Sequence, residues 1–183
     1  SYGAAPRRGE TLSDAYEGET YQVRVYYRGP LKYTGAPRAI RMDITRDEIL
    51  LTPAQDRELI HPYSDSDELE APTITCYSLE EILAEKLRAI GGQRRFAISR
   101  DIYDIHQLVQ AGVVISDVIS LVPTKFAVRG LDPSAVDLDR IKMRRSEFER
   151  DWERHLSYLV RGKTEFEAAW TTTLEVLQHL EHH

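Results

Sequence analysis

The hydrophobic period of this chain changes once, at Ser78. Before Ser78, apolar and polar side chains alternate over Tyr21 to Tyr27 and over Ala39 to Thr45, which is typical of half-buried β-strands. After Ser78, apolar residues recur every three or four positions, as on one face of a helix. The sequence therefore predicts an α/β chain of the α+β type, with a strand-rich part over residues 1–77 and a helical part over residues 78–179.

Short runs complete the expected strand-rich part. The strand candidates after Thr45 are Ile49 to Thr52, Glu58 to Tyr63 and Thr73 to Tyr77, and Ser64 to Glu70 is expected to form an acidic loop.

The helical part carries its own start and stop signals. Ser78 and Glu81 form the S-x-x-E pattern of a capping box, and Gly91 ends the first expected helix. Ser99 is a candidate N-cap of a second helix, which Gly112 closes. A third helix is expected to begin at Ser116 and to be limited by Pro123, and Asp132-Pro133-Ser134 is a further helix start. One long helix is expected over Asp139 to Val160. A final helix has an apolar stripe of Phe166, Trp170, Leu174 and Leu177. We expect the helical half to pack against the sheet through Leu79, Ile82, Leu83, Leu87, Ile102, Ile105 and Leu108.

Composition excludes several classes of protein. The formal net charge of the 183 residues is −6, which is not that of a uniformly basic nucleic-acid binder. No run of 18 apolar residues is present, so we expect a cytoplasmic protein with no membrane-spanning helix. The single cysteine, Cys76, excludes a disulfide framework and a paired-cysteine zinc site. Residues 180–183 resemble the start of a Leu-Glu-polyhistidine tag and are set aside as a tag remnant.

Lys86 is the most informative single residue. It falls inside the apolar arc of the first expected helix, between Ile82 and Ile90. A lysine at such a position either extends its ammonium group to solvent or meets a carboxylate or a phosphate.

Two aspartates follow in the next expected helix. Asp101 and Asp104 border its apolar stripe. One interpretation is that Asp101 only favours the helix N-terminus electrostatically. The other is that the two helices pack antiparallel, as helices joined by a short loop often do, and bring Lys86 and Asp101 into one cleft.

Asp43 and the arginines are further candidates with two interpretations each. A carboxylate inside a strand is disfavoured, so Asp43 lies either on a solvated face with Arg41 or in a metal and phosphate site. Arginines form bidentate contacts with phosphates but equally form ordinary surface ion pairs. The arginines concerned are Arg88, Arg94, Arg95 and Arg100, with a second basic run from Arg140 to Arg145.

Three segments together resemble a known family. They are Arg41-Met42-Asp43-Ile44, Ser78 to Ile90 (SLEEILAEKLRAI), and Arg94 followed by Arg100 to Ile105 (RDIYDI). These residues are similar to those of the AbiEii/AbiGii-type nucleotidyltransferases, toxin components of bacterial abortive-infection and toxin–antitoxin systems. The resemblance implies a polymerase-β-like nucleotidyltransferase core, in which helices flank a mixed β-sheet, with a C-terminal helical domain.

The resemblance also implies roles for the residues and for the partners. Asp43 would bind Mg²⁺, Lys86 would contact the phosphates of a nucleoside triphosphate, and Asp101 and Asp104 would complete the catalytic set. Nucleotide or RNA contacts would come from Arg41, Arg88, Arg94, Arg95 and Arg100. The implied acceptor is RNA, in particular tRNA, and the implied protein partner is a cognate antitoxin.

One family motif has no counterpart in the sequence. The family carries a Gly-Ser pair followed by D-x-D before the strand that begins here at Tyr21, whereas Asp65-Ser66-Asp67 comes after Asp43. Two interpretations follow. Either the motif lies upstream of Ser1, which we expect, or the chain is a catalytically degenerate module that binds nucleotide or another protein.

Overall fold

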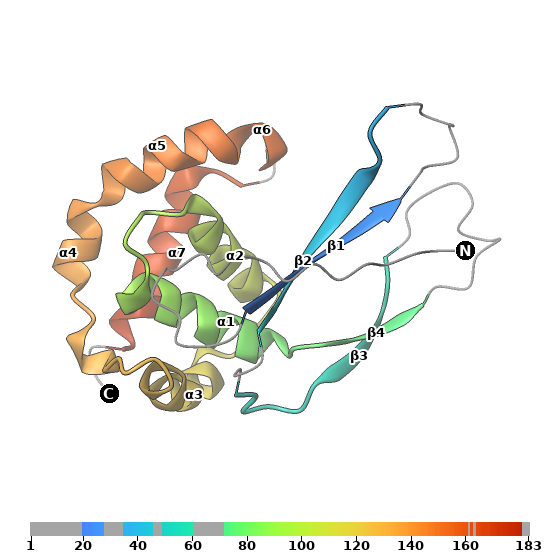
Figure 1. Cartoon of the computed structure of the whole chain (residues 1–183). Helices are drawn as coiled ribbons and strands as arrows, with labels where there is room; N and C mark the ends of the chain where they lie inside the picture. The colour runs from blue at the N-terminus through green and yellow to red at the C-terminus, as the bar shows by residue number, and fades with distance from the viewer. Residues whose placement is uncertain are drawn as a thin grey trace. The chain divides into compact units, whose positions relative to one another are not determined.

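A computed structural model describes residues 20–27, 35–45, 49–60, 72–160, 162 and 164–180 of the chain (Figure 1). The chain divides into two compact units, Ser1–Ile49 and Leu50–His183. The described strands lie between Thr20 and Cys76 and the helices between Leu79 and Gln178, which confirms the α+β class.

In the first unit, the strands β1 (Thr20–Tyr27) and β2 (Arg38–Thr45) form an antiparallel ladder. The register pairs Tyr21 with Ile44 and Val23 with Met42, so the apolar residues of both strands share one face. The expected alternation is therefore confirmed. Val23 and Val25 are partly buried, as expected. The expected half-burial is wrong for Tyr21, Tyr27, Ile40, Met42 and Ile44, which are exposed, because the described strands of this unit form only a two-stranded ladder.

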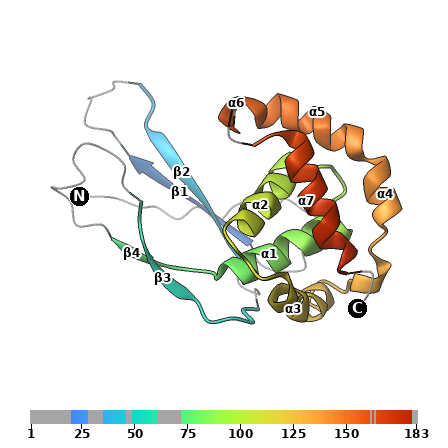
Figure 2. The same ribbon diagram turned by 180° about the vertical axis from the view of Figure 1, so that it is seen from behind.

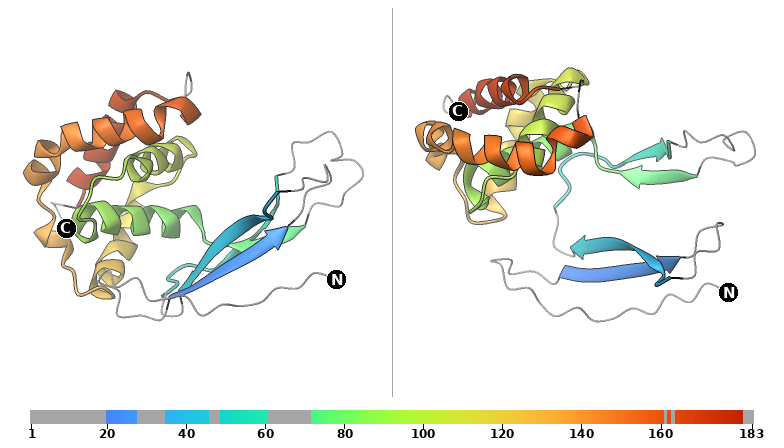
Figure 3. Two further views of the ribbon diagram at one scale, coloured as in Figure 1. Left: turned by 45° about the horizontal axis from the view of Figure 1, so that its top comes forward. Right: turned by 90° about the horizontal axis from the view of Figure 1, so that it is seen from above.

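The second unit holds a separate ladder of β3 (Gln55–Glu58) and β4 (Thr73–Cys76), seen with the first ladder in Figure 3. The strand expected over Ile49 to Thr52 is not formed, because the Leu51 and Thr52 amides donate to the Glu81 carboxylate instead of to a neighbouring strand. The strand expected from Glu58 is also misplaced, since β3 ends there. Residues 61–71, with His61, the acidic loop and the D-x-D at residues 65–67, lie outside the described residues.

The described helical elements follow in chain order (Figures 1 and 2). They are α1 (Leu79–Arg88), the π-helical turn η2 (Ala89–Gln93), α2 (Ser99–Gln110), α3 (Ile115–Ala127), the 3₁₀ turn η3 (Pro133–Ala135), α4 (Leu138–Met143), α5 (Arg145–His155), α6 (Ser157–Val160) and α7 (Phe166–Gln178). None of the described helices is long and apolar enough to cross a membrane.

The buried apolar core of the described residues lies among these helices. Its members run from Leu83 to Leu180, with α1 packed on α3 and α2, and α2 packed on α7. The expectation that the helices would pack against the sheet through their apolar stripes is therefore wrong, because the stripes face one another. Leu79, at the first turn of α1, remains 37% exposed, whereas Leu83, one turn later, is fully buried.

Core packing also corrects two helix boundaries. Pro123 lies inside α3 and does not limit it, because the helix continues through the buried Phe126. The long helix expected over Asp139 to Val160 is divided into α4, α5 and α6. The divisions fall at Arg144 and Leu156, whose backbone angles depart from helical values, and Leu156 turns into the core.

Candidate functional site

The α1–α2 hairpin brings Lys86 and Asp101 into direct contact. Lys86 lies in the last turn of α1 and Asp101 in the first turn of α2. The Lys86 Nζ atom lies 2.9 Å from Asp101 Oδ1 and 2.6 Å from Asp104 Oδ2. Of the two sequence-based interpretations, the structure confirms the one in which the lysine meets the carboxylate. The catalytic role of the three residues stays a prediction.

Asp101 is the hub of this cluster. Its side chain is only 2% exposed, and its second oxygen, Oδ2, accepts a hydrogen bond from Arg94 Nε at 3.0 Å. A buried carboxylate is stable only when its charge is matched and hydrogen-bonded, and here each oxygen receives one cation. The four charges of Lys86, Arg94, Asp101 and Asp104 sum to zero.

The turn η2 places Arg94 for this contact. The Arg94 amide donates to the Ala89 carbonyl at 2.9 Å, which closes the turn. Gly91 allows the turn to pass the core closely, since a Cβ atom there would lie 2.9 Å from Val136 and 3.0 Å from Phe126. A larger residue at Gly91 would displace the segment that carries Arg94.

The electrostatics keep Lys86 charged. Burial acts to lower the pKa of Lys86, but the hydrogen bonds to Asp104 and Asp101 outweigh that effect and raise the pKa above its ordinary value. Lys86 is therefore protonated at neutral pH and can act as a fixed positive charge. A general base would need a lowered pKa, so the geometry does not favour that role.

Exposure increases from the hub outward. Asp101 is buried, Lys86 is partly exposed, and the side chains of Asp104 and Arg94 are 40% and 44% exposed. An anion arriving from solvent therefore meets Arg94 and Lys86 at the rim, where Asp104 is the carboxylate that it could displace. Two cations that converge on one solvent-facing rim suit a phosphate group.

The other arginines named from the sequence take different positions. Arg88 is buried and pairs with Glu85, and it points about 200° around α1 from Lys86, so it does not share the solvent-facing rim with Lys86 and Arg94. Arg95 and Arg100 are exposed, and the Arg95 carbonyl accepts a hydrogen bond from Arg144 Nη2 at 3.2 Å. Arg41 lies on β2, opposite Arg24.

Asp43 is exposed on β2, opposite Gln22. It belongs to the first unit, and its relation to Lys86 stays a prediction. An exposed carboxylate suits Mg²⁺ as one ligand, because this ion commonly binds one or two carboxylates together with water and substrate phosphates. Among residues 20–27, 35–45, 49–60, 72–160 and 164–180, no group of three or more His, Cys, Asp or Glu side chains is arranged to hold a metal.

Sequence reasoning missed a second charged cluster, on a different side of α1 from Lys86. Glu81 and Lys125 are both buried and form an ion pair, and Lys125 Nζ lies 2.9 Å from Glu85. The Glu81 carboxylate also accepts hydrogen bonds from the Leu51 and Thr52 amides, at 3.2 and 3.1 Å. Its partners are thus 29 or more residues away in the chain, which no local pattern signals.

The structure also tests the capping box expected at Ser78 and Glu81. Ser78 does cap α1, since its Oγ accepts from the Glu81 amide at 3.1 Å, so half of the expected capping box is confirmed. Burial acts to raise the pKa of Glu81, but hydrogen bonds from Lys125, Leu51 and Thr52 outweigh it and lower the pKa. The same ion pairs raise the pKa of Lys125 against the effect of burial. This buried cluster connects α1 to α3 and to the Leu51–Thr52 segment.

A third constellation contains serine, aspartate and histidine but lacks the geometry of a hydrolase. Asp151 Oδ2 accepts from both the amide and the Oγ of Ser99 at 2.7 Å, and His155 Nδ1 lies 2.8 Å from Asp151 Oδ1. The carboxylate lies between serine and histidine, so the imidazole cannot take the serine proton. Burial acts to raise the pKa of Asp151, while the bonds from Ser99 and His155 lower it. Ser99 is thus the first residue of α2 and not its N-cap, and Asp151 satisfies its amide.

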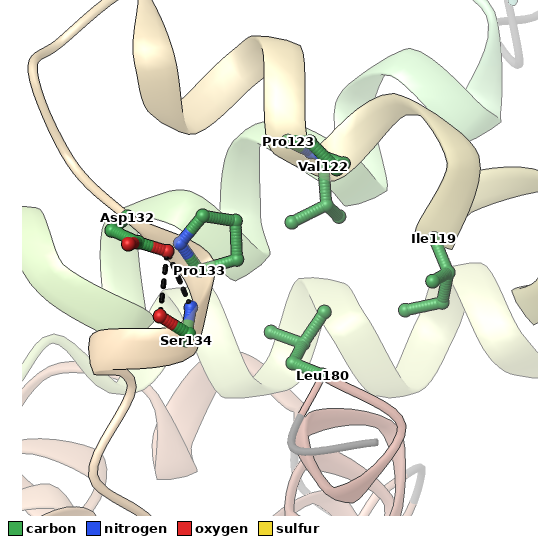
Figure 4. A pocket seen from close by; sticks show the side chains of 7 residues that line it. All are labelled: Ile119, Val122, Pro123, Asp132, Pro133, Ser134 and Leu180. Atoms are coloured by element: carbon green, nitrogen blue, oxygen red, sulfur yellow. Dashed lines mark hydrogen bonds between the residues drawn. The ribbon is translucent and has the colours of Figure 1, made fainter. Parts of the chain in front are cut away.

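An apolar pocket of about 180 Å³ lies elsewhere in the helical unit (Figure 4). Asp132 lies at its edge and accepts hydrogen bonds from the amide and hydroxyl of Ser134. No cation lines this pocket, so it does not suit a phosphate. Its apolar lining comprises Ile119, Val122, Pro123, Pro133 and Leu180, the last of which is buried although the sequence analysis set it aside.

One comparison with known proteins gives a match. A family model described as the nucleotidyl transferase AbiEii toxin of type IV toxin–antitoxin systems matches residues 3–174. The match spans the strands, the α1–α2 hairpin and most of α7. No curated protein and no solved structure matches the chain.

Proposed function

The chain belongs to the AbiEii family of nucleotidyl transferase toxins, and from this membership we propose that it transfers a nucleotide from a nucleoside triphosphate to RNA, with tRNA as the acceptor. The observation that carries the proposal is the cluster of Lys86, Asp101 and Arg94. One buried carboxylate holds two cations at a solvent-facing rim. Such a rim supplies what a triphosphate requires, namely converging positive charge in a fixed orientation.

Each member of the cluster has a distinct task in this proposal. Lys86 and Arg94 bind phosphate oxygens and stabilise the negative charge that develops on the pyrophosphate leaving group. Asp101 is a positioning residue, because its two oxygens fix the two cations. Asp104 shares Lys86 with Asp101 and is the more exposed of the two carboxylates, so the incoming phosphate competes with Asp104 for the ammonium group.

Asp43 is the proposed metal ligand. Bound Mg²⁺ would neutralise phosphate charge and orient the reacting hydroxyl. Asp43 would contribute one carboxylate oxygen to the ion, and the exposed position of its side chain on β2 supports this assignment. A cognate antitoxin is the proposed protein partner, in keeping with the type IV toxin–antitoxin family.

The decisive experiment combines full-length protein, Mg²⁺, labelled nucleoside triphosphates and total bacterial RNA. We expect label in the tRNA fraction, lost on addition of EDTA. Lys86→Ala should abolish most transfer, whereas Lys142→Ala should not, because Lys142 is an exposed lysine of α4 that pairs only with the nearby Asp139 among the described residues. Label in no RNA fraction, from a protein that still binds nucleotide, would support the catalytically degenerate module instead.

A further inference from the structure

Phe96 differs from every other phenylalanine in the chain. The sequence contains four phenylalanines, and Phe126, Phe148 and Phe166 are buried in the helical core. Phe96 is 72% exposed. A single exposed aromatic residue needs no special explanation by itself. Its surroundings are what make this one informative.

The loop that carries Phe96 is fixed on both sides. Before it, Arg94 is held by the Ala89 carbonyl and by Asp101, and the Arg95 carbonyl accepts a hydrogen bond from Arg144. After it, Ser99 is held by Asp151 through its amide and its hydroxyl. The exposure of Phe96 therefore does not arise from a loosely held backbone. The fold presents this ring to solvent at a defined place.

A cation lies beside the ring, and a second one is close in the chain. The Arg95 guanidinium carbon lies 5.9 Å from the centroid of the Phe96 ring, and Arg94 precedes it by two residues. Two residues span at most about 7 Å of chain, so the backbone of Phe96 lies close to that of Arg94. Exposed aromatic rings next to arginines are the usual means of binding single-stranded nucleic acid, because bases stack on the ring while cations hold the backbone.

We propose that Phe96 is a stacking platform for an unpaired nucleobase of the acceptor RNA. The inference rests on the proposed function, since it takes RNA as the substrate whose 3′ end must approach Lys86 and Arg94. Arg95 binds the RNA phosphate next to the stacked base. Arg94 and Lys86, which Asp101 links to each other, bind the triphosphate. The platform thereby lies within two residues of Arg94, one of the two cations. It selects single-stranded ends over paired ends.

The test introduces a tryptophan at the proposed platform. In Phe96→Trp, the new indole is exposed, whereas the native Trp152 and Trp170 are buried and give a constant background. Titration with a short single-stranded oligoribonucleotide ending in CCA should quench the exposed indole. Binding measured independently should be retained in Phe96→Trp and weakened about 5- to 150-fold in Phe96→Ala and in Phe96→Leu. Phe96→Leu keeps an apolar side chain, so a loss of affinity in this variant shows that binding requires the aromatic ring.

Matched controls separate stacking from other effects. Tyr158→Ala removes another exposed aromatic residue, which lies on α6. Arg144, the contact of the Phe96 loop, precedes α5, whereas α6 follows it, so this variant should leave the affinity for the oligoribonucleotide unchanged. A blunt RNA duplex should quench the indole fluorescence of Phe96→Trp only weakly. Equal quenching by the duplex, quenching by nucleoside triphosphate alone, or full affinity in Phe96→Ala would overturn the proposal.

The proposal and the proposed function can fail separately. If the oligoribonucleotide quenches Phe96→Trp and yet no nucleotide is transferred to any RNA, the stacking platform stands and the transferase activity does not. If transfer to tRNA proceeds equally in the parent and in Phe96→Ala at limiting RNA, the activity stands and the platform does not. Because Phe96 is exposed, its variants should melt at the temperature of the parent.

Discussion

The Nζ atom of Lys86 and the Oδ1 atom of Asp101 lie 2.9 Å apart, across the turn that joins α1 to α2. Fifteen residues separate them in the chain. The contact explains how a lysine can occupy an apolar arc without leaving a buried charge unmatched. The contact also joins the end of α1 to the start of α2. The orientation of the two helices and the position of the Lys86 ammonium group therefore depend on each other.

Lys86→Ala should reduce nucleotide transfer by about 10²–10³-fold, because one preorganised electrostatic contact is typically worth that much. Single-turnover rates at saturating nucleotide and RNA measure the effect. The melting temperature must stay near that of the parent. An undiminished rate would remove Lys86 from the catalytic assignment.

Asp101→Ala should cost about 1–3 kcal/mol of unfolding free energy, measured by urea denaturation. The cost stays below that of a fully enclosed pair because the partners Lys86 and Arg94 reach solvent. Asp43→Asn should leave the midpoint unchanged, since Asp43 is exposed, and should reduce Mg²⁺-dependent transfer at least as much as Lys86→Ala. Equal destabilisation by the two aspartate variants would contradict the placement of Asp101 as the buried hub.

Leu83→Ala should destabilise the protein by about 2–5 kcal/mol, because it opens a cavity at a fully buried position. Leu79→Ala, one turn earlier on the same helix, removes the same atoms from a partly exposed position. It should cost less than about 1 kcal/mol. The two denaturation curves together test which face of α1 is buried. Similar midpoints for the two variants would show that the buried face of α1 is wrongly assigned.

Lys125→Met should be strongly destabilising, by about 3–5 kcal/mol, because it leaves the buried Glu81 without its cation. Lys142→Met removes an exposed lysine from a surface pair with Asp139 and should change the unfolding free energy by no more than about 1 kcal/mol. A double variant with Glu81→Gln should recover part of the loss. No recovery would mean that Lys125 stabilises the fold through packing alone.

Stability should fall in acid through Glu81. Its pKa is lowered in the folded protein from the ordinary 4.5, so its contribution is fully present above that value. The contribution is lost as the pH falls through the folded pKa, because the unfolded chain then binds the proton more readily. Denaturation measured from pH 6 downward should show a smaller acid loss in Glu81→Gln than in the parent. Parallel curves for both proteins would exclude Glu81 as a source of the acid sensitivity.

Much of the local structure could be predicted from the sequence. The alternation over β1 and β2 gave the strands and the shared apolar face, and the apolar arc around Lys86 indicated that this lysine meets a partner. Ser78 marked the start of α1. These features follow from backbone geometry, which fixes a period of about two residues in strands and 3.6 in helices.

Tertiary structure decided the contacts between residues that are distant in the chain. No local sequence pattern indicates the bonds of Glu81 to the Leu51–Thr52 segment or those of Ser99 to Asp151, since the partners are 29, 30 and 52 positions apart. The same holds for the division of the long helix at Leu156 and for the packing of helices on helices in place of a sheet. A period specifies which face of an element is apolar, whereas the surface that covers that face is chosen by the packing of the whole unit.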